Sequence, residues 1–317
     1  MRSFRFGAIT YWANVPAKQW IPTVRRLEEI GYSTIFEADH FGKNANDPVV
    51  MLSSAAAATE KIHLGTLVFD VDYRHPVILA RTAAALHLLS DGRFEFGIGA
   101  GWSRVDYDMA GIPFDPPGVR IRRLDEALQI IRSMWTEDNT TFHGKHYRIT
   151  NMVKAGDLPD GEHPKIMVGG GGRKLLTVAG RHADIVGIQW PIPGGSFSGR
   201  SIRDTTIDHV KRRIEWVKTA AEKAGRNPDD IEFQMLFPHP RITDEPESVM
   251  VDIANNWGVT VEEVTECPQW LIGSSSDIVE KLRRLRDETG INYMVFGPTS
   301  AEQFIELAES VLKPLSS

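Results

Sequence analysis

Apolar and polar positions along the chain follow two alternating periods. Short stretches with a period of two or a continuous apolar run predict strands, and each is followed by a segment with helical spacing, as where Leu124, Leu128 and Ile131 share one face. The expected strands cover residues 4–12, 33–38, 62–69, 93–99, 165–168, 184–189, 231–237 and 292–297. The expected helices cover residues 16–30, 48–59, 76–90, 119–135, 173–181, 207–224, 247–256, 261–265, 276–289 and 301–312.

Eight successive strand-then-helix units predict an α/β fold, a TIM (β/α)8 barrel with insertions. We expect one domain over residues 1–317, with two loop-rich excursions at about 140–164 and 190–206. An open doubly wound sheet is the alternative, because its first units look the same. Eight regular repeats without a shift in composition favour the barrel.

Composition narrows the classes of function. The 317 residues carry 36 Lys and Arg against 42 Asp and Glu, a net charge of −6, without a basic block. A nucleic-acid partner is therefore not expected. The single cysteine, Cys267, excludes an internal disulfide framework and a multi-cysteine metal site, and it fits a cytoplasmic protein. No run of about 18 apolar residues occurs, so no membrane span is expected.

A run of four glycines, residues 169–172, joins the fifth expected strand to the helix that begins with Arg173 and Lys174. Glycines allow positive φ angles and a close approach of backbone to a ligand, and the first N–H groups of a helix attract anions. This pattern predicts a phosphate-binding turn, although a tight turn without a ligand is the alternative. The following residues do not supply the Gly-Lys-Ser/Thr of a P-loop, so nucleotide hydrolysis is not indicated.

Other candidates stand at strand ends, where barrel enzymes place their chemistry. His40 follows the second strand beside Asp39, and can transfer a proton or simply form a buried hydrogen bond to Asp39 or a carbonyl. The fourth strand ends in Gly97-Ile98-Gly99-Ala100-Gly101-Trp102, which allows a flat ring to approach the backbone but lacks the dinucleotide spacing. Glu37 and Asp70 are expected to make polar contacts in the barrel wall. No zinc-protease or serine-esterase signature occurs.

The order of several segments carries a resemblance to a known family. They are Ala38-Asp39-His40-Phe41, Leu64-Gly65-Thr66-Leu67-Val68, Gly92-Arg93-Phe94 with the Gly97 to Trp102 segment, Gly111-Ile112-Pro113-Phe114, and Val168 to Gly172. With them, the chain resembles the luciferase-like oxidoreductases that depend on a flavin or a deazaflavin. Tyr73-Arg74-His75-Pro76 and the unbroken segment from Ala110 to Arg120 are similar to members that use the deazaflavin coenzyme F420.

The resemblance implies where the cofactor would lie. Its ring system would occupy the barrel mouth, with a non-proline cis peptide at Leu67-Val68 behind the ring and its phosphate on the loop after the fifth strand. The cofactor-binding residues expected from this are Leu67, Val68, Gly99, Gly101, Trp102, Gly170, Gly171, Gly172 and Arg173. His40 matches a position beside the reacting carbon in sugar-phosphate dehydrogenases of the family. Those relatives carry an acid where this chain has Trp102, which favours an apolar or aromatic substrate pocket with Trp12 and Trp190.

The expected function is that of an F420-dependent oxidoreductase, which transfers a hydride between the deazaflavin and a small organic substrate. His40 is the expected proton donor or cofactor partner, and Asp39 the residue that orients it. An FMN-dependent monooxygenase, a non-catalytic flavin-binding protein and a barrel aldolase or hydrolase are the alternatives. The small residues at 53–58 and 80–85 can pack on the barrel or form a homodimer interface, and the resemblance favours the homodimer.

Overall fold

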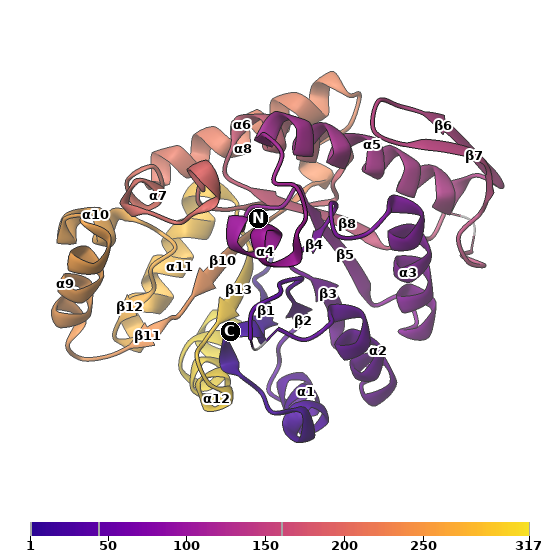
Figure 1. The fold of residues 1–317 in the computed structure, drawn as a ribbon. Helices are drawn as coiled ribbons and strands as arrows, with labels where there is room; N and C mark the ends of the chain where they lie inside the picture. Colours follow the sequence, from indigo (N-terminus) through magenta and orange to yellow (C-terminus); the bar gives the residue numbers. More distant parts are fainter. Residues whose placement is uncertain (1, 44, 160, 317) are drawn as a thin grey trace.

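A ring of eight parallel strands forms the centre of the computed structural model, which describes residues 2–43, 45–159 and 161–316 (Figure 1). The strands are β1 (Arg5–Ile9), β2 (Thr34–Glu37), β3 (His63–Thr66), β5 (Phe94–Gly99), β8 (Lys165–Gly170), β9 (Ile185–Ile188), β10 (Glu232–Pro238) and β13 (Tyr293–Gly297). The first strand pairs with β2 on one side and β13 on the other, and the β3–β5 pairing closes the ring. The expected TIM barrel is therefore confirmed.

Helices surround this ring (Figure 1). They are α1 (Trp20–Glu29), α2 (Pro48–Ala58), α3 (Pro76–Leu89), α4 (Arg104–Ala110), α5 (Pro117–Thr136), α6 (Arg173–His182), α7 (Gly199–Arg203), α8 (Ile207–Lys223), α9 (Pro246–Trp257), α10 (Val261–Glu266), α11 (Ser275–Thr289), α12 (Ala301–Leu307), the π-helical turn η5 (Ala308–Leu312) and α13 (Lys313–Ser316). Short 3-10 turns are η1 (Tyr11–Ala13), η2 (Ala17–Gln19), η3 (Pro193–Gly195) and η4 (Pro228–Asp230). Within the described part of the chain, no helix combines the length and the apolar character that a membrane crossing requires.

The strand sequences alternate between the two sides of the barrel wall. Inward-facing Phe36, Met167 and Tyr293 belong to one buried cluster, which is separate from the larger core under the helices. Glycines make room for the largest of these side chains: a Cβ atom at Gly65 would lie 2.4 Å from the Phe36 ring, and one at Gly7 2.8 Å from it. A parallel sheet buried on both faces in this way requires apolar residues on both sides of most strands.

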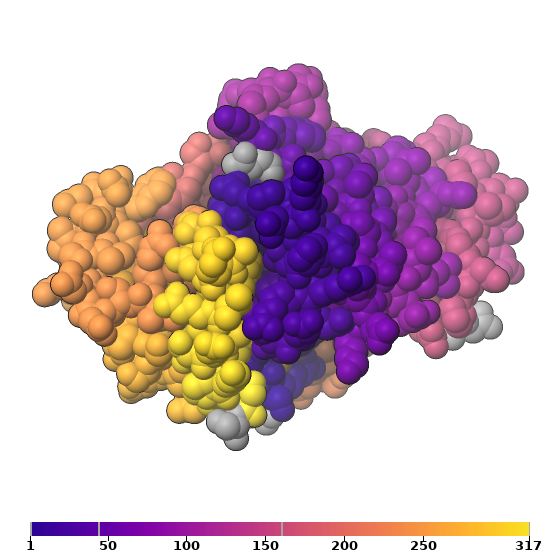
Figure 2. Space-filling view, turned by 90° about the horizontal axis from the view of Figure 1, so that it is seen from below, coloured from indigo at the N-terminus to yellow at the C-terminus, as the bar shows by residue number. Residues whose placement is uncertain are grey.

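The two ends of the chain meet where the barrel closes. The C-terminal helices lie beside the N-terminal segment, yellow next to indigo in Figure 2. The Tyr32 hydroxyl, just after α1, donates a hydrogen bond of 3.1 Å to the Phe304 carbonyl in α12. This contact joins the first and last βα units.

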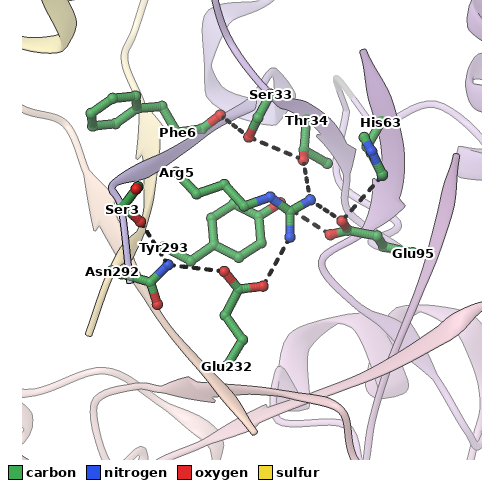
Figure 3. Close-up of polar contacts among 10 residues, drawn as sticks. All are labelled: Ser3, Arg5, Phe6, Ser33, Thr34, His63, Glu95, Glu232, Asn292 and Tyr293. Atoms are coloured by element: carbon green, nitrogen blue, oxygen red, sulfur yellow. Dashed lines mark hydrogen bonds and ion pairs between the residues drawn. The ribbon is translucent and has the colours of Figure 1, made fainter. Parts of the chain in front are cut away.

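A buried cluster of charged groups fills the N-terminal end of the barrel (Figure 3). The Arg5 guanidinium forms an ion pair with Glu95 and donates to Glu232 Oε2 and Thr34 Oγ1, each at 3.0 Å. The Tyr293 hydroxyl donates to Glu95 Oε2 at 3.0 Å, and the guanidinium carbon of Arg5 lies 4.1 Å from the centre of the Tyr293 ring. Residues at this end of a barrel serve stability, so we assign this cluster to the fold.

Several element boundaries differ from those expected. The first strand ends at Ile9, because residues 11–13 form the turn η1. The third is split into β3 and β4 (Phe69–Asp70), and β4 pairs with the tip of β5. The first excursion contains the antiparallel hairpin β6 (Asn139–His143) and β7 (Arg148–Val153), and the second contains η3 and α7. These short elements depend on local pairing that hydrophobic periodicity does not report.

Candidate active site

His40 and Asp106 form a close pair at the C-terminal end of the barrel. The Nδ1 atom of His40 lies 2.5 Å from Asp106 Oδ2, and the backbone N–H of Phe41 donates to Asp106 Oδ1 at 3.4 Å. Asp106 is only 5% exposed, so solvent does little to weaken its contact with this histidine. A carboxylate at Nδ1 selects the tautomer and fixes the ring, and it leaves Nε2 for a reacting group.

Sequence reasoning missed Asp106, which is 66 residues from its partner. It lies in the first turn of α4, a helix that was not expected. Ser103 followed three residues later by Asp106 is the spacing of a capping box, and that signal could have revealed the helix. No side chain caps α4, and the acid contacts His40 instead.

Two aromatic rings enclose His40. The ring centres of Tyr11 and Trp102 lie 5.2 and 5.6 Å from the centre of the imidazole. Trp102 is 44% exposed, so it stands between the histidine and solvent. Burial and the Asp106 charge raise the pKa of the Tyr11 hydroxyl. The histidine thus has an acid on one side and an aromatic wall around it.

Asp39 does not orient His40, contrary to the expectation. Its carboxylate accepts two hydrogen bonds of 3.3 Å from the Arg74 guanidinium and one of 3.4 Å from the Asp70 backbone N–H. Burial raises the pKa of Asp39, and the bonds from Arg74 oppose that rise. Both residues lie in the loop after β2, which ends at Glu37. In this loop Asp39 is bound to Arg74, whereas His40 contacts Asp106.

The tips of β3 and β5 meet at the peptide Leu67-Val68, which is cis in the structure. A Cβ atom at Gly97 would lie 1.8 Å from the Thr66 carbonyl oxygen, and one at Gly99 would lie 2.8 Å from a methyl group of Val68. Only glycine allows this approach between the two strands. The expected position of the cis peptide is confirmed.

Gly101 serves the shape of the loop after β5. Its φ angle is +69°, and a Cβ atom there would meet the Tyr107 hydroxyl at 1.9 Å and Asp70 Oδ2 at 2.3 Å. The Tyr107 hydroxyl donates to Asp70 Oδ1 at 3.0 Å, and burial raises the pKa of Asp70 to about 7. The Arg120 guanidinium donates to the carbonyl of Gly101 at 2.6 Å. Asp70 is thus a polar contact of the barrel wall, as expected.

The glycine run differs from the expectation in one respect: none of its four residues has a positive φ angle. The requirement for glycine is steric, since a Cβ atom at Gly171 would lie 2.5 to 2.6 Å from the backbone of residues 189–191, and one at Gly170 would lie 2.4 Å from the Leu175 side chain. At Gly172 a Cβ atom would meet nothing within 4 Å. The turn is held from behind by buried Arg213, which donates to the Gly171 carbonyl at 3.1 Å.

Gly172 is also the N-cap of α6, and no side chain caps this helix. The first N–H groups of a helix have no partner within it, so those of α6 are free to bind an anion at the barrel mouth. Arg173 follows directly, with its guanidinium carbon 5.8 Å from the centre of the Trp216 ring. Around the ring, β3 and β5 lie between β2, which precedes His40, and β8, which leads into this turn.

The tryptophans of the expected substrate pocket occupy different places. Trp12 lies 5.3 Å from the His239 ring and fills the space above Gly297, where a Cβ atom would lie 2.4 Å from the indole. Trp190 belongs to a separate apolar cluster, with Phe197 at 4.7 Å and Trp270 at 5.5 Å between ring centres. Trp102 alone of the three stands beside His40.

The geometry permits two kinds of chemistry at one barrel mouth. His40 can hold or move a proton at Nε2, and the start of α6 can hold an anion. Among the described residues, no group of three or more His, Cys, Asp and Glu side chains has the arrangement of a metal site.

Comparisons with known proteins give this site a context. A curated F420-dependent glucose-6-phosphate dehydrogenase of Amycolatopsis mediterranei (strain U-32) is 26% identical over 314 residues, which cover 92% of each chain. The solved structure of an F420-dependent secondary alcohol dehydrogenase in complex with an F420-acetone adduct has a TM-score of 0.81 at 17% identity and covers all of both chains. An EDTA monooxygenase from Chelativorans sp. BNC1 has a TM-score of 0.79 at 13% identity, covering 99% of this chain and 94% of the other.

The solved structures, at these identities, share the fold. The sequence model of the luciferase-like monooxygenase family matches residues 4–264 and identifies the family. The chain belongs to the luciferase-like monooxygenase family.

Proposed function

We propose that the protein is an F420-dependent oxidoreductase that transfers a hydride between the deazaflavin and a small organic substrate. Family membership and the curated relative from Amycolatopsis support the cofactor. The observation that carries the proposal is the His40–Asp106 pair at the same barrel mouth as the uncapped start of α6. The start of α6 supplies an anion site for the phosphate of the cofactor. The histidine supplies a proton site for the substrate oxygen during hydride transfer.

The residues present fit F420. Its phosphate would lie on the N–H groups at Gly172 and Arg173, where the backbone is open and no side chain competes. Its ring would lie against Leu67, Val68 and Gly99, where β3 and β5 are in contact. When bound, F420 supplies the hydride chemistry, and the protein supplies position and protons.

The chain's own residues divide the remaining work. Asp106 holds the imidazole of His40 so that Nε2 can give a proton to the substrate oxygen or take one from it. Trp102 and Tyr11 limit the access of water to the histidine. An exposed indole beside the proton donor favours substrates with an apolar or aromatic body over sugar phosphates.

Cofactor binding tests the proposal directly. Titration of the purified protein into F420 should quench the fluorescence of the deazaflavin, and FMN should bind more weakly. With a reduced F420 supply and a panel of small ketones and enones, His40→Ala should lose turnover and still quench F420. Binding of FMN without binding of F420 would refute the proposal.

An FMN-dependent monooxygenase is the second candidate. The family's own description and the fold likeness to the EDTA monooxygenase favour it. It would consume oxygen when supplied with reduced FMN, whereas the F420 enzyme would not. Measurement with an oxygen electrode, with both cofactors in parallel, separates the two.

We further propose a cytoplasmic homodimer built on α2 and α3. These helices expose large apolar side chains, with Val50 66% and Ile78 54% exposed. The single cysteine, Cys267, is buried and free, as is usual in a reducing compartment. Light scattering should return twice the chain mass of 35.5 kDa. A value near one chain mass would reject the dimer.

A further inference from the structure

A cavity of about 300 Å³ lies outside the barrel wall, apart from the mouth described above. It is open to solvent on one side and is bordered by the ends of β1 and β2, the starts of α1 and α2, and the loops that lead into these helices. The helices α1 and α2 lie side by side at this edge of the barrel (Figure 1). The described lining residues are Thr10, Tyr11, Asn14, Val15, Pro16, Ala17, Trp20, Glu37, Lys43, Ala45, Asn46 and Met51. Its volume is at the lower end of the range for small-molecule sites.

A buried carboxylate lies at the inner end of this cavity. Glu37 is 5% exposed, and its described hydrogen-bond partner is the Thr10 hydroxyl, which donates to Oε1. Burial without a cationic partner disfavours the charged form of a carboxyl group and raises its pKa. Burial raises the pKa of Glu37 to about 7. The hydroxyl of Thr10 offsets only part of this rise.

The charged groups around Glu37 do not neutralise it. Among the described lining residues, Lys43 and Tyr11 are the other ionisable side chains, and Lys43 is exposed to solvent. The next acid on the strand, Asp39, is bound to Arg74, and Asp47 at the start of α2 is bound to the same guanidinium. Among the described residues no cation forms an ion pair with Glu37, although the ammonium group of Lys43 belongs to the same lining.

Polar groups make up most of the lining, and the side chains of Trp20 and Met51 add an aromatic and an apolar surface to it. Trp20 and Met51 close the sides, and the indole N–H of Trp20 is already bound to the Met51 carbonyl and the Ser54 hydroxyl. Asn14 and Asn46 add amide groups to the lining. An acid with an apolar wall and an aromatic face is the combination that binds organic cations.

We propose that this cavity is a second ligand site, and that it takes a small organic ammonium or amidinium ion whose charged end pairs with Glu37. The apolar body of the ligand lies against Trp20 and Met51. The site is separated from the barrel mouth by Tyr11, whose ring contacts His40 on one side and lines the cavity on the other. The proposal does not depend on the identity of the redox cofactor.

Benzylamine is a suitable probe, with benzyl alcohol as its neutral counterpart. The amine stays protonated between pH 6 and 8, and over this interval the ionised fraction of a group with a pKa of about 7 rises roughly tenfold. The affinity of the full-length protein for benzylamine, measured by calorimetry or by the shift of the Trp20 indole resonance, should rise about tenfold from pH 6 to 8. Benzyl alcohol should show no such rise.

Three variants complete the test. Glu37→Gln should weaken benzylamine binding at pH 8 at least tenfold and remove its pH dependence, and Glu60→Gln, which removes an exposed acid away from the cavity, should change neither. Ala17→Trp fills the cavity from an exposed position without touching the acid, and it should abolish binding of both probes even if Glu37→Gln folds poorly. Absence of benzylamine binding to the unaltered protein, equal binding to Glu37→Gln, or displacement of benzylamine by F420 would each overturn the proposal.

Discussion

Replacement of Arg5 by methionine should strongly destabilise the barrel without affecting its mouth. The variant keeps the apolar part of the side chain and removes the guanidinium that holds Glu95 and Glu232 together (Figure 3). The two carboxylates have side chains only 2% and 13% exposed. The variant leaves Glu95 with its contacts to Tyr293 and His63, and Glu232 with its hydrogen bond from Asn292, but without the guanidinium that balances their charge.

The size of the effect follows from this burial. Removal of one member of a buried ion pair costs about 3–5 kcal/mol, and we expect about 3 kcal/mol here because the Arg5 side chain is itself 18% exposed. For a chain of 317 residues that loss lowers the melting temperature by roughly 4–5 °C. An exposed pair offers the control: Arg104→Met removes the pair with Asp108, whose two side chains are each 60% exposed, and should cost less than about 0.5 kcal/mol.

Urea unfolding followed by circular dichroism measures these differences. The double variant Arg5→Met/Glu95→Gln removes one of the orphaned charges, so it should recover about 1–2 kcal/mol relative to the sum of the single effects. Fluorescence quenching of F420 should be unchanged in Arg5→Met and in the double variant, because the cluster lies at the opposite end of the barrel. If Arg5→Met is no less stable than Arg104→Met, or if the two single effects simply add, the cluster does not have the role assigned to it.

Three further predictions concern the mouth and the outer cavity. Asp106→Asn should lower turnover roughly 10²-fold, a typical loss for acid–base catalysis, with unchanged F420 affinity, because His40 loses the carboxylate that fixes its tautomer. Gly171→Ala should weaken F420 binding at least ~10-fold, since its Cβ atom would collide with backbone, whereas Gly172→Ala should bind normally. Glu37 binds a proton in the folded state up to a pKa of about 7, against about 4.5 when unfolded. The stabilisation that comes from this protonated carboxyl group is therefore complete below pH 4.5 and is lost as the pH rises to 7. The free energy of unfolding should fall by up to about 3 kcal/mol over this interval, and by less in Glu37→Gln.

The controls for these predictions differ. If Asp106→Asn lost F420 affinity together with turnover, the role of Asp106 would be to bind the cofactor and not to orient His40. Equal F420 affinity of the two glycine variants would place the phosphate elsewhere. A flat stability profile between pH 5 and 7, measured by urea unfolding, would contradict the state assigned to Glu37.

The periodicity of the chain was sufficient to predict the barrel. Each βα unit is encoded locally, since strand and helix periods are properties of consecutive residues, and the eight strands appear within a few residues of their expected positions. The turn after β8 and the cis peptide at Leu67-Val68 were also expected, the first from its glycines and the second from a family resemblance carried by contiguous segments. The elements that periodicity missed include α4 and the β6–β7 hairpin, which are short, and the hairpin depends on local strand pairing.

The partners of buried polar groups were decided by the tertiary structure. Asp39 is adjacent to His40 in the chain, yet Asp39 is bound to Arg74, and the histidine contacts an acid 66 residues away. Arg5 and Glu232, which are 227 residues apart, meet only because the barrel closes. Periodicity determines which residues face inward, but pairing between distant positions depends on how the strands are arranged around the ring. The sequence alone thus determined the barrel and the glycine turn after β8, and only the folded chain determined which acid contacts the histidine and which acid lines the outer cavity.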